Sequence, residues 1–545
     1  MFSKPQWPYV RRYRDALMDS IKSMLMVALS GIRKAVKTGA QLLSCSGLRT
    51  FRSGQPTVPL SFALSKTATA ATPLGHWLRD RLPHSTNTGF MLLPRGAGAF
   101  ALRAELAQRS TQTLDIQTYI FEDGLTSRLL LDRMLSTAQQ GVRVRFLIDD
   151  LTVADQQAML AALDSHPNIE VRVFNPILYG RRHALTRKIM LVLGCVRLHR
   201  RMHNKLWIAD NVMGITGGRN LSDDYFSADA DHEFADLDIL AAGQTVSSLS
   251  QSFDDYWNHT LAKPLARFES ATHNAWQTLW HTLKQRLDKE LSERTDYSEA
   301  LDQLNSHAFD ELAEQLCWAE GKVMWDSPDK LMTLGRPVHE RLLIDDLAVE
   351  FSRIKKRLFA ISGYFVPRQL KCLDISALLQ RNIEVTVVTN ALEATDVALV
   401  HGGYAPCRVP LLHEGIQLHE LRSQPASMPR RLPQARSTSL HAKAIALDDD
   451  RIIIGSFNLD PRSVWWNSEI AVVVKSSELN RRLCEMGSAV LAPERSYRVT
   501  LDADNKLQWF TRNKGQDCRL ARDPGSRWRH LQAWVSAKVR LYSLL

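Results

Sequence analysis

The chain has 545 residues, of which 45% are hydrophobic and 23% are charged. These values lie near the averages of soluble globular proteins, so they exclude a fibrous or wholly disordered chain, and the length predicts several packed units. The net charge is +11. Seven cysteines occur singly, without a CxxC pair or a short metal-binding spacing, so neither a disulfide framework nor a zinc site is indicated.

Residues 1–85 are predicted to form a basic segment and linker close to a membrane. Residues 1–55 contain ten Lys or Arg residues and two Asp residues, so the rest of the chain is nearly neutral. Such a segment suits an anionic surface, either phospholipid head groups or nucleic acid, although a solvated disordered tail is the plain alternative. The apolar run that begins at Met24 is shorter than the roughly 20 residues of a membrane-spanning helix, so we expect no crossing there.

The tetrapeptide Leu42-Leu43-Ser44-Cys45 has the shape of a lipoprotein cleavage box, in which the cysteine becomes lipidated. However, Lys34 and Lys37 interrupt the apolar stretch that should precede such a box. Two interpretations therefore stay open: a lipid anchor at Cys45, or a plain cysteine after a basic amphipathic helix.

Residues 86–258 are predicted to form a first α/β half. The segment 113–121 alternates apolar and polar residues as a strand does, a helical stretch follows, and 142–148 is a second strand. This order predicts parallel strands covered by helices. Further along lies a motif of the form HxKxxxxD, made by His203, Lys205 and Asp210, and Asn220 comes 17 residues after the histidine.

Residues 259–335 carry Trp and Leu at helical spacing and are predicted to form a helical connector. The features of the first half then recur in residues 336–485, where strand-like segments at 357–365 and 383–388 flank a helical stretch. His441, Lys443 and Asp448 repeat the motif, and Asn458 again lies 17 residues after the histidine. Residues 486–545 are predicted to form helices and a basic, Trp-containing tail that packs on the body.

The repeated motif has the functional groups that a phosphodiester needs. The residues after each Lys are apolar, as in a buried strand, and the two-residue period places His and Lys on one face of it. Two copies brought face to face supply two imidazoles, two ammonium groups and two Asn amides around one anion. A lone HxK would carry little weight, since core and surface histidines are common, whereas two copies in register indicate function.

The predicted reaction is phosphoryl transfer without a metal ion. Fixed Lys and amide donors stabilise the charge that develops on the non-bridging oxygens. One histidine can attack phosphorus to give a covalent phosphohistidine, while the other protonates the leaving alcohol and then deprotonates the incoming one. No carboxylate cage accompanies either motif, so we expect the Lys pair to replace a metal and no cofactor to be needed.

Supporting roles are predicted for residues around the motifs. Asn220, Asn458 and Ser456 are expected to bind substrate. Asp210 and Asp448, which complete the catalytic motifs, are expected to support the loop and not to meet substrate.

An acid downstream of each motif is expected to orient that motif's imidazole. Asp236 follows the first motif and Glu469 follows the second, each beside an apolar strand.

At these motifs the chain resembles the phospholipase D superfamily, and within it the bacterial cardiolipin synthases of the type without N-terminal transmembrane helices. The resemblance covers residues 86–545 and includes the segments Tyr119-Ile-Phe-Glu-Asp123, Arg200-Arg-Met-His-Asn-Lys205 and Tyr364-Phe-Val-Pro367. It implies an α/β fold of two similar α/β/α sandwich halves, packed with pseudo-two-fold symmetry around one active site. It also implies transfer of a phosphatidyl group from a donor phospholipid to phosphatidylglycerol, with His203 as nucleophile and His441 as acid and base.

These features favour a peripheral enzyme of the bacterial inner membrane that acts on anionic and zwitterionic phospholipids, namely phosphatidylglycerol and a phosphatidyl donor. Nucleic acid is the less favoured partner, because apolar residues in the leader and the basic-flanked apolar segment 189–196 suit a lipid interface. An activating protein partner stays an open question. The alternative enzyme is a hydrolytic phospholipase D, phosphodiesterase or nuclease with the same paired site. A non-enzymatic binder with a vestigial site leaves two complete motifs unexplained.

Overall fold

The structure is a computed structural model. It describes residues 59–539, except for 83–86, 154, 178–198, 230–231, 294–305, 334–341, 368–369, 371–372 and 425–436. The basic leader 1–55, Cys45 and the apolar segment 189–196 therefore lie outside the described residues.

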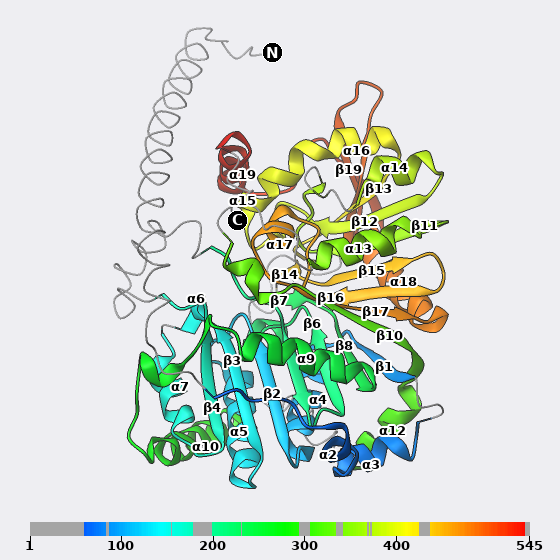
Figure 1. Ribbon diagram of the computed structural model, residues 1–545. Coiled ribbons are helices and arrows are strands. Elements are labelled where there is room, and N and C mark those ends of the chain that lie inside the picture. The colour runs from blue at the N-terminus through cyan, green and yellow to red at the C-terminus, as the bar shows by residue number, and fades with distance from the viewer. Residues whose placement is uncertain are drawn as a thin grey trace, which may run out of the picture.

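In the part of the chain that the structure describes, eighteen strands join into one sheet that runs through both halves of the molecule (Figure 1). From its first edge the order is β9 (Ala262–Pro264), β4 (Ile169–Phe174), β3 (Arg143–Asp149), β2 (Thr113–Thr118), β5 (Leu206–Ala209), β6 (Met213–Gly217), β8 (Asp238–Gly243) and β1 (Thr88–Leu93). It continues with β10 (Cys317–Trp325), β17 (Ile470–Lys475), β16 (Arg451–Gly455), β15 (Lys443–Leu447), β11 (Arg357–Ser362), β12 (Glu384–Asn390), β13 (Gln417–Leu421), β18 (Ser496–Leu501), β19 (Leu507–Asn513) and β20 (Gln516–Leu520).

The strand order repeats, as the duplicated motif predicts. The order β4-β3-β2-β5-β6-β8-β1 is matched by β13-β12-β11-β15-β16-β17-β10, and the halves meet where β1 pairs with β10 in antiparallel register, Phe90 opposite Cys317. The three strands from β2 to β4 and from β11 to β13 are parallel, as expected. The other strands are antiparallel, so the sheet is mixed, because short turns such as that between β5 and β6 can join only antiparallel neighbours.

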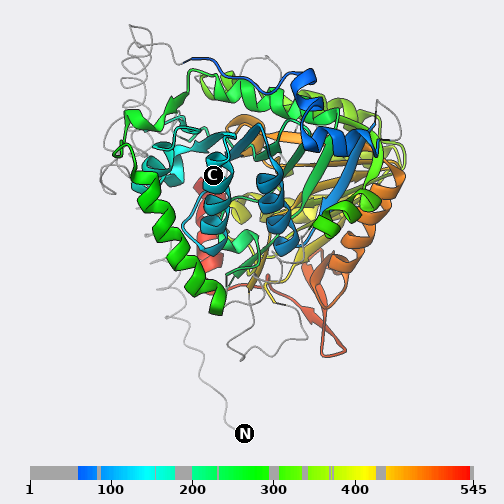
Figure 2. The same cartoon turned by 90° about the horizontal axis from the view of Figure 1, so that it is seen from below.

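Helices cover both faces of the sheet and make each half an α/β/α sandwich (Figures 1 and 2). One core layer of the first half lies beneath α4 (Gly96–Arg109), α5 (Leu125–Gln139) and α7 (Gln157–Asp164), and its counterpart lies beneath α13 (Leu343–Ser352), α14 (Ile375–Gln380) and α16 (Arg408–Glu414). In α5, Leu130, Leu131, Met134 and Ala138 recur at helical spacing and are buried. A third core cluster joins α9 (Thr245–Trp257), α18 (Ser477–Leu491) and strands of both halves.

Short elements complete the described fold. They are the helices α2 (Lys66–Ala70), α3 (Pro73–Arg79), α6 (Asp150–Val153), α15 (Ala398–Tyr404) and α17 (Pro461–Trp465), and the 3-10 turns η1 (Asp223–Tyr225), η2 (Leu265–Arg267), η3 (Pro328–Leu331) and η5 (Ala405–Cys407). A separate two-stranded parallel pair, β7 (His232–Ala235) with β14 (Ser437–Leu440), ties the two halves together beside the motifs. None of the helices in the described ranges is long and apolar enough to cross a membrane.

The connector and the tail differ in part from the sequence prediction. The connector is helical in α10 (Ala275–Glu293) and α12 (Ser306–Gln315), but β10 belongs to the central sheet. In the tail, β18, β19 and β20 extend the sheet before α19 (Arg527–Val539) begins. β18 to β20 are partly exposed, so their apolar pattern is weak. They join the sheet where β18 pairs with the distant β13, and β19 and β20 follow as hairpin neighbours.

Candidate active site

The two motifs occupy equivalent central positions of the sheet. The residues after Lys205 form β5, and Lys443 begins β15, so the prediction of a strand at each motif is confirmed. β5 pairs with β2, and β15 pairs with β11, in the same antiparallel sense. The side chains of His203, His441, Lys205 and Lys443 are all buried.

Each histidine is held by an acid from the other half of the molecule. The Nδ1 atom of His203 lies 2.8 Å from Oε2 of Glu469, and Nδ1 of His441 lies 2.6 Å from Oδ2 of Asp236. Each acid was expected to face the imidazole of its own half, but in the structure the two partners are exchanged. Both acids face imidazoles, as expected, but the imidazoles are the opposite ones.

Backbone contacts between the halves explain this exchange. The N–H of His203 donates to the carbonyl of Ser468, directly before Glu469, and the N–H of His441 donates to the carbonyl of Ala235, directly before Asp236, both at 2.9 Å. These hydrogen bonds hold each histidine next to the acid that directly follows the accepting residue, Ser468 or Ala235. With Nδ1 engaged by a carboxylate, Nε2 is the ring nitrogen left for substrate.

The two imidazole–carboxylate pairs differ in charge. Burial, assisted by the charges of Lys205 and Lys443, holds the pKa of His203 well below its ordinary value, and burial together with Lys443 lowers the pKa of His441. Burial raises the pKa of Glu469 to about 7. Burial also acts to raise the pKa of Asp236, but the charges of His441 and Lys443 outweigh it, so the pKa of Asp236 is lowered. The His441 pair therefore carries the more firmly ionised acid.

The two lysines lie behind the histidines. The Nζ of Lys205 donates to the carbonyl of His203 at 2.7 Å, and Lys443 makes the same contact with His441. Burial lowers the pKa of both ammonium groups, that of Lys205 to about 7. Neither lysine is among the residues that line the cavity described next.

One cavity of about 380 Å³ brings the two motifs together. Its wall includes His203, His441, Asn220 and Asn458, so four of the predicted site residues from opposite halves share one space. The other lining residues are Tyr119, Ile120, Leu151, His199, Arg201, Tyr225, Tyr364, Asp396, Val397, Val400, Asp460, Arg462, Ser463 and Asn467.

Ser456 does not line this cavity, which differs from its predicted role in substrate binding. Its side chain is fully buried and its hydroxyl donates to Oε2 of Glu469, the same oxygen that faces His203. The glycine before it, Gly455, packs so closely on the backbone of Ile470 and Ala471 that a larger residue would clash. Ser456 thus fixes the carboxylate that holds the histidine.

The aspartates that complete the motifs also lie outside the cavity, at tight turns. Both have a left-handed φ of +50°. Asp210 accepts hydrogen bonds from the backbone N–H groups of Thr111, Gln112 and Thr113 at 2.8–2.9 Å. These contacts support the loop, and neither aspartate is among the residues that line the cavity.

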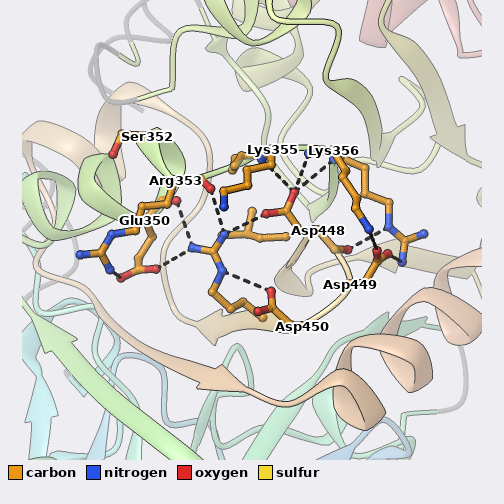
Figure 3. Close-up of polar contacts among 12 residues, drawn as sticks. Glu350, Ser352, Arg353, Lys355, Lys356, Asp448, Asp449 and Asp450 are labelled. Atoms are coloured by element: carbon orange, nitrogen blue, oxygen red, sulfur yellow. Dashed lines mark hydrogen bonds and ion pairs between the residues drawn. The ribbon is translucent and has the colours of Figure 1, made fainter.

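Asp448 does the same in the second half. Its Oδ1 accepts from the N–H groups of Lys355 at 3.0 Å and Lys356 at 2.8 Å, and its Oδ2 lies 3.1 Å from the guanidinium of Arg451 (Figure 3). Arg451 also pairs with Glu350 at 3.0 Å. The last residue of each motif therefore ties the motif strand to the start of its antiparallel neighbour, β2 or β11.

Sequence reasoning missed several residues of the cavity wall. The ring of Tyr119 packs edge-on against His203 at 5.0 Å, and that of Tyr225 against His441 at 5.1 Å. Tyr119 and Tyr364 follow corresponding strands, β2 and β11, and that shared position was the signal that could have found them. Arg201 and Asp396 carry no such repeat. No group of three or more His, Cys, Asp or Glu side chains within the described ranges could hold a metal ion.

Comparison with known proteins identifies the family. A family model described as "Cardiolipin synthase, PLD-like domain" matches residues 104–257 and 348–486, more than half of the chain. Cardiolipin synthase C of Escherichia coli strain K12 is 32% identical over 472 residues, which cover 85% of this chain and 96% of that protein. Cardiolipin synthase A of Proteus mirabilis is 21% identical over 73% of this chain and 68% of its own length.

A crystal structure of phosphatidylserine synthase from Haemophilus influenzae Rd KW20 has a similar fold. Its TM-score is 0.50 at 14% identity, and the match covers 78% of this chain and 91% of that one. The repeated α/β/α halves, the paired motifs and these comparisons agree. The chain belongs to the cardiolipin synthase-like family of the phospholipase D superfamily, and it is a phosphotransferase.

Proposed function

We propose that the protein forms cardiolipin by transferring a phosphatidyl group from a donor phospholipid to phosphatidylglycerol. The observation that carries this proposal is the pair of imidazoles in one cavity, each with Nδ1 held by a carboxylate of the opposite half. Two relatives that match most of the chain, from Escherichia coli and Proteus mirabilis, are named as cardiolipin synthases, which supports phospholipids as the substrates.

The proposed reaction passes through a phosphohistidine. The Nε2 of His203 attacks the phosphorus of the donor, and the bond from phosphorus to the leaving alcohol breaks as His441 protonates that alcohol. His441 then takes the proton of the acceptor hydroxyl, which attacks phosphorus and releases His203. The charge asymmetry supports this division of roles. Burial holds the pKa of His203 well below its ordinary value, whereas the ionised Asp236 opposes the burial that lowers the pKa of His441.

The residues of the chain supply the charge that the reaction needs. Lys205 and Lys443 hold ammonium groups at the main-chain carbonyls of His203 and His441, and Asn220 and Asn458 contribute amides to the cavity wall. Fixed donors in a buried site stabilise the developing negative charge without the reorganisation that water would need. We propose that this set acts without a divalent ion.

We further propose that the enzyme works at the surface of the bacterial inner membrane as a peripheral protein. The outward face of α19 supports this, because Trp528, Leu531 and Trp534 are 65%, 42% and 37% exposed, and the exposed Arg527 and Lys538 flank them. Aromatic residues bordered by cations suit an interface with anionic lipid. A lipid anchor at Cys45 stays a sequence-based hypothesis.

Helix α19 also lies beside the cavity. Its opposite face packs on α15, where Gly402 approaches the carbonyl of Ala533 so closely that a larger residue would clash. Val397 and Val400, before and within α15, line the cavity. A membrane contact made by α19 would therefore bring the lipid surface close to α15, which lies beside it (Figure 1) and contributes Val400 to the cavity wall.

Product analysis of the purified enzyme tests the proposal. With vesicles of phosphatidylglycerol, thin-layer chromatography should show cardiolipin, in the presence of EDTA as well as without it. Adding phosphatidylethanolamine tests whether it serves as the phosphatidyl donor. If phosphatidic acid is the only product, the enzyme is a hydrolase, and if EDTA stops the reaction until a divalent ion is restored, the metal-free mechanism is wrong.

A further inference from the structure

Arg201 lines the catalytic cavity two residues before His203, and the transfer mechanism gives it no role. Its side chain is fully buried, and one nitrogen, Nη1, lies 3.2 Å from Oδ1 of Asp149. The other two nitrogens, Nε and Nη2, are buried without a hydrogen-bond partner. A buried guanidinium with two free donors is unusual, because nearly all buried polar groups are paired.

The protein holds this guanidinium in a fixed position. The carbonyl of Arg201 accepts from the N–H of Ser468 at 2.9 Å, which binds the segment to the opposite half. Asp149, at the end of β3, accepts from the N–H of Met202 at 3.0 Å and pairs with the guanidinium through its other oxygen. Backbone and side chain are thus ordered before any substrate arrives, so a ligand would meet a preorganised donor.

The free donors suit a phosphate. Nε and Nη2 lie on the same edge of the guanidinium, and their parallel N–H groups match two oxygens of a phosphate or carboxylate. Other unpaired groups of the same cavity suit hydroxyl groups: the side-chain amides of Asn220, Asn458 and Asn467 each keep a buried polar atom without a partner. A phosphodiester next to hydroxyl groups is the chemistry of the phosphatidylglycerol head group.

We propose that Arg201 binds the phosphodiester of the phosphatidylglycerol molecule that accepts the phosphatidyl group. This inference rests on the proposed function and deepens it by assigning the acceptor's subsite. Two phosphodiesters must occupy the cavity during transfer, and Lys205 and Lys443 stand behind the histidines that handle the reacting one. The second anion needs a cation of its own, which Arg201 supplies.

Arg201 makes and breaks no bond in this proposal. The acceptor's hydroxyl oxygen forms the new bond to phosphorus, the bond from phosphorus to Nε2 of His203 breaks, and the hydroxyl proton passes to His441. Arg201 holds the acceptor's own phosphate so that this hydroxyl, and not water or another alcohol, occupies the attacking position.

Competition between two acceptors tests the inference. Phosphatidylglycerol vesicles are supplied with labelled glycerol, which has hydroxyl groups and no phosphate. Cardiolipin and labelled phosphatidylglycerol then arise from the same phosphatidyl-enzyme, so their ratio depends on the acceptor step alone. Arg201→Gln should lower the ratio of cardiolipin to labelled phosphatidylglycerol at least tenfold. Arg201→Lys keeps the charge but loses the two parallel N–H donors, so it should lower the ratio by less.

Arg200→Gln is the matched control, because Arg200 is an equally buried neighbour that donates to the carbonyls of Lys330 and Trp465 and does not line the cavity. Its product ratio should equal that of the wild type. A ratio within twofold of wild type in both Arg201 variants overturns the inference, as does an equal fall in the Arg200 variant. If Arg201→Gln does not fold, Arg201→Lys decides. A wild-type enzyme that labels phosphatidylglycerol but makes no cardiolipin contradicts the proposed function instead.

Discussion

The two histidines of the cavity are alike in sequence and different in surroundings. In both, Nδ1 is in hydrogen-bond contact with a carboxylate. Burial raises the pKa of Glu469 to about 7, whereas the charges of His441 and Lys443 keep the pKa of Asp236 low. Identical motifs can therefore take different parts in one reaction. This asymmetry arises from the acids and not from the motifs, so the motif sequence alone could not reveal it.

Replacing either histidine should abolish turnover. In His203→Ala the nucleophile is lost, and in His441→Ala the proton donor is lost, so cardiolipin formation should fall by more than about a hundredfold in each, as removal of a bonding group does. The exposed His413 on α16 provides the control, since His413→Ala should leave the rate unchanged. More than a tenth of wild-type activity in either single variant would contradict the two-histidine mechanism.

The exchanged acids can be tested by observing each histidine directly. Glu469→Gln should shift the imidazole NMR signals of His203, and Asp236→Asn those of His441, because the carboxylate fixes the tautomer of the ring that it contacts. Both variants should lose about ten- to a hundredfold in turnover, as removal of an orienting partner commonly does. The reverse pattern of shifts would show that each acid serves its own half.

Glu469 should also make stability depend on pH. Because burial raises its pKa to about 7 from 4.5, the folded state binds more protons than the unfolded state between these values, and stability falls as pH rises through that window. The free energy of unfolding of Glu469→Gln, minus that of the wild type, should therefore be larger at pH 8 than at pH 4 by on the order of 1–3 kcal/mol. Urea unfolding at the two pH values measures this difference. The exposed Glu314→Gln should show none, and a constant difference for Glu469→Gln would rule the effect out.

At the scale of elements, the motif aspartates join strands. Asp210 and Asp448 each accept hydrogen bonds from several backbone N–H groups of the chain entering β2 or β11, so each motif strand is fastened to its antiparallel neighbour. The motif therefore combines two tasks. His and Lys serve the cavity, and the aspartate holds the strands in register.

Asp210→Ala should destabilise the fold more than Asp448→Ala. Asp210 is fully buried, whereas Asp448 is partly exposed and water can replace some of its contacts. We expect losses of about 3–5 kcal/mol for the former and about 1–2 kcal/mol for the latter in the free energy of unfolding. Chemical denaturation measures both, with Asp504→Ala, in an exposed turn, as the control. Equal losses would mean that burial does not decide the contribution.

The sequence predicts the repeat and its main elements well. Strands with strong apolar patterns, such as β2, β3 and β12, were found, and the equal spacing of His and Asn in both copies identified the site. The positions of β10 and β18 to β20 were missed, because their apolar patterns are weak and because β10 and β18 enter the sheet by pairing with distant strands. The exchange of Asp236 and Glu469 was missed for a related reason: distance along the chain carries no information about which half supplies a contact.

At the scale of the whole molecule, the expected membrane contact has two parts. The leader 1–55 carries ten basic residues, and α19 presents Trp528 and Leu531 outward. Charge acts at long range and is screened by salt, whereas burial of apolar side chains is not. The two contributions can therefore be separated by ionic strength.

Deleting residues 1–55 should weaken sedimentation with anionic vesicles mainly at low salt, because each basic residue near such a surface contributes about 1 kcal/mol. Trp528→Ser should instead weaken the binding that remains at high salt. The exposed Phe510→Ser, on β19, serves as the control for loss of an exposed aromatic residue. If both variants sediment with the vesicles as strongly as the unchanged protein at every salt concentration, the membrane contact lies elsewhere.

The crossed pairing of histidines and acids also makes each half depend on the other. A fragment with only one half would carry a histidine without the carboxylate that orients it, and a carboxylate without its histidine. Neither half alone therefore contains a complete imidazole–carboxylate pair, and both pairs form only when the two halves pack together.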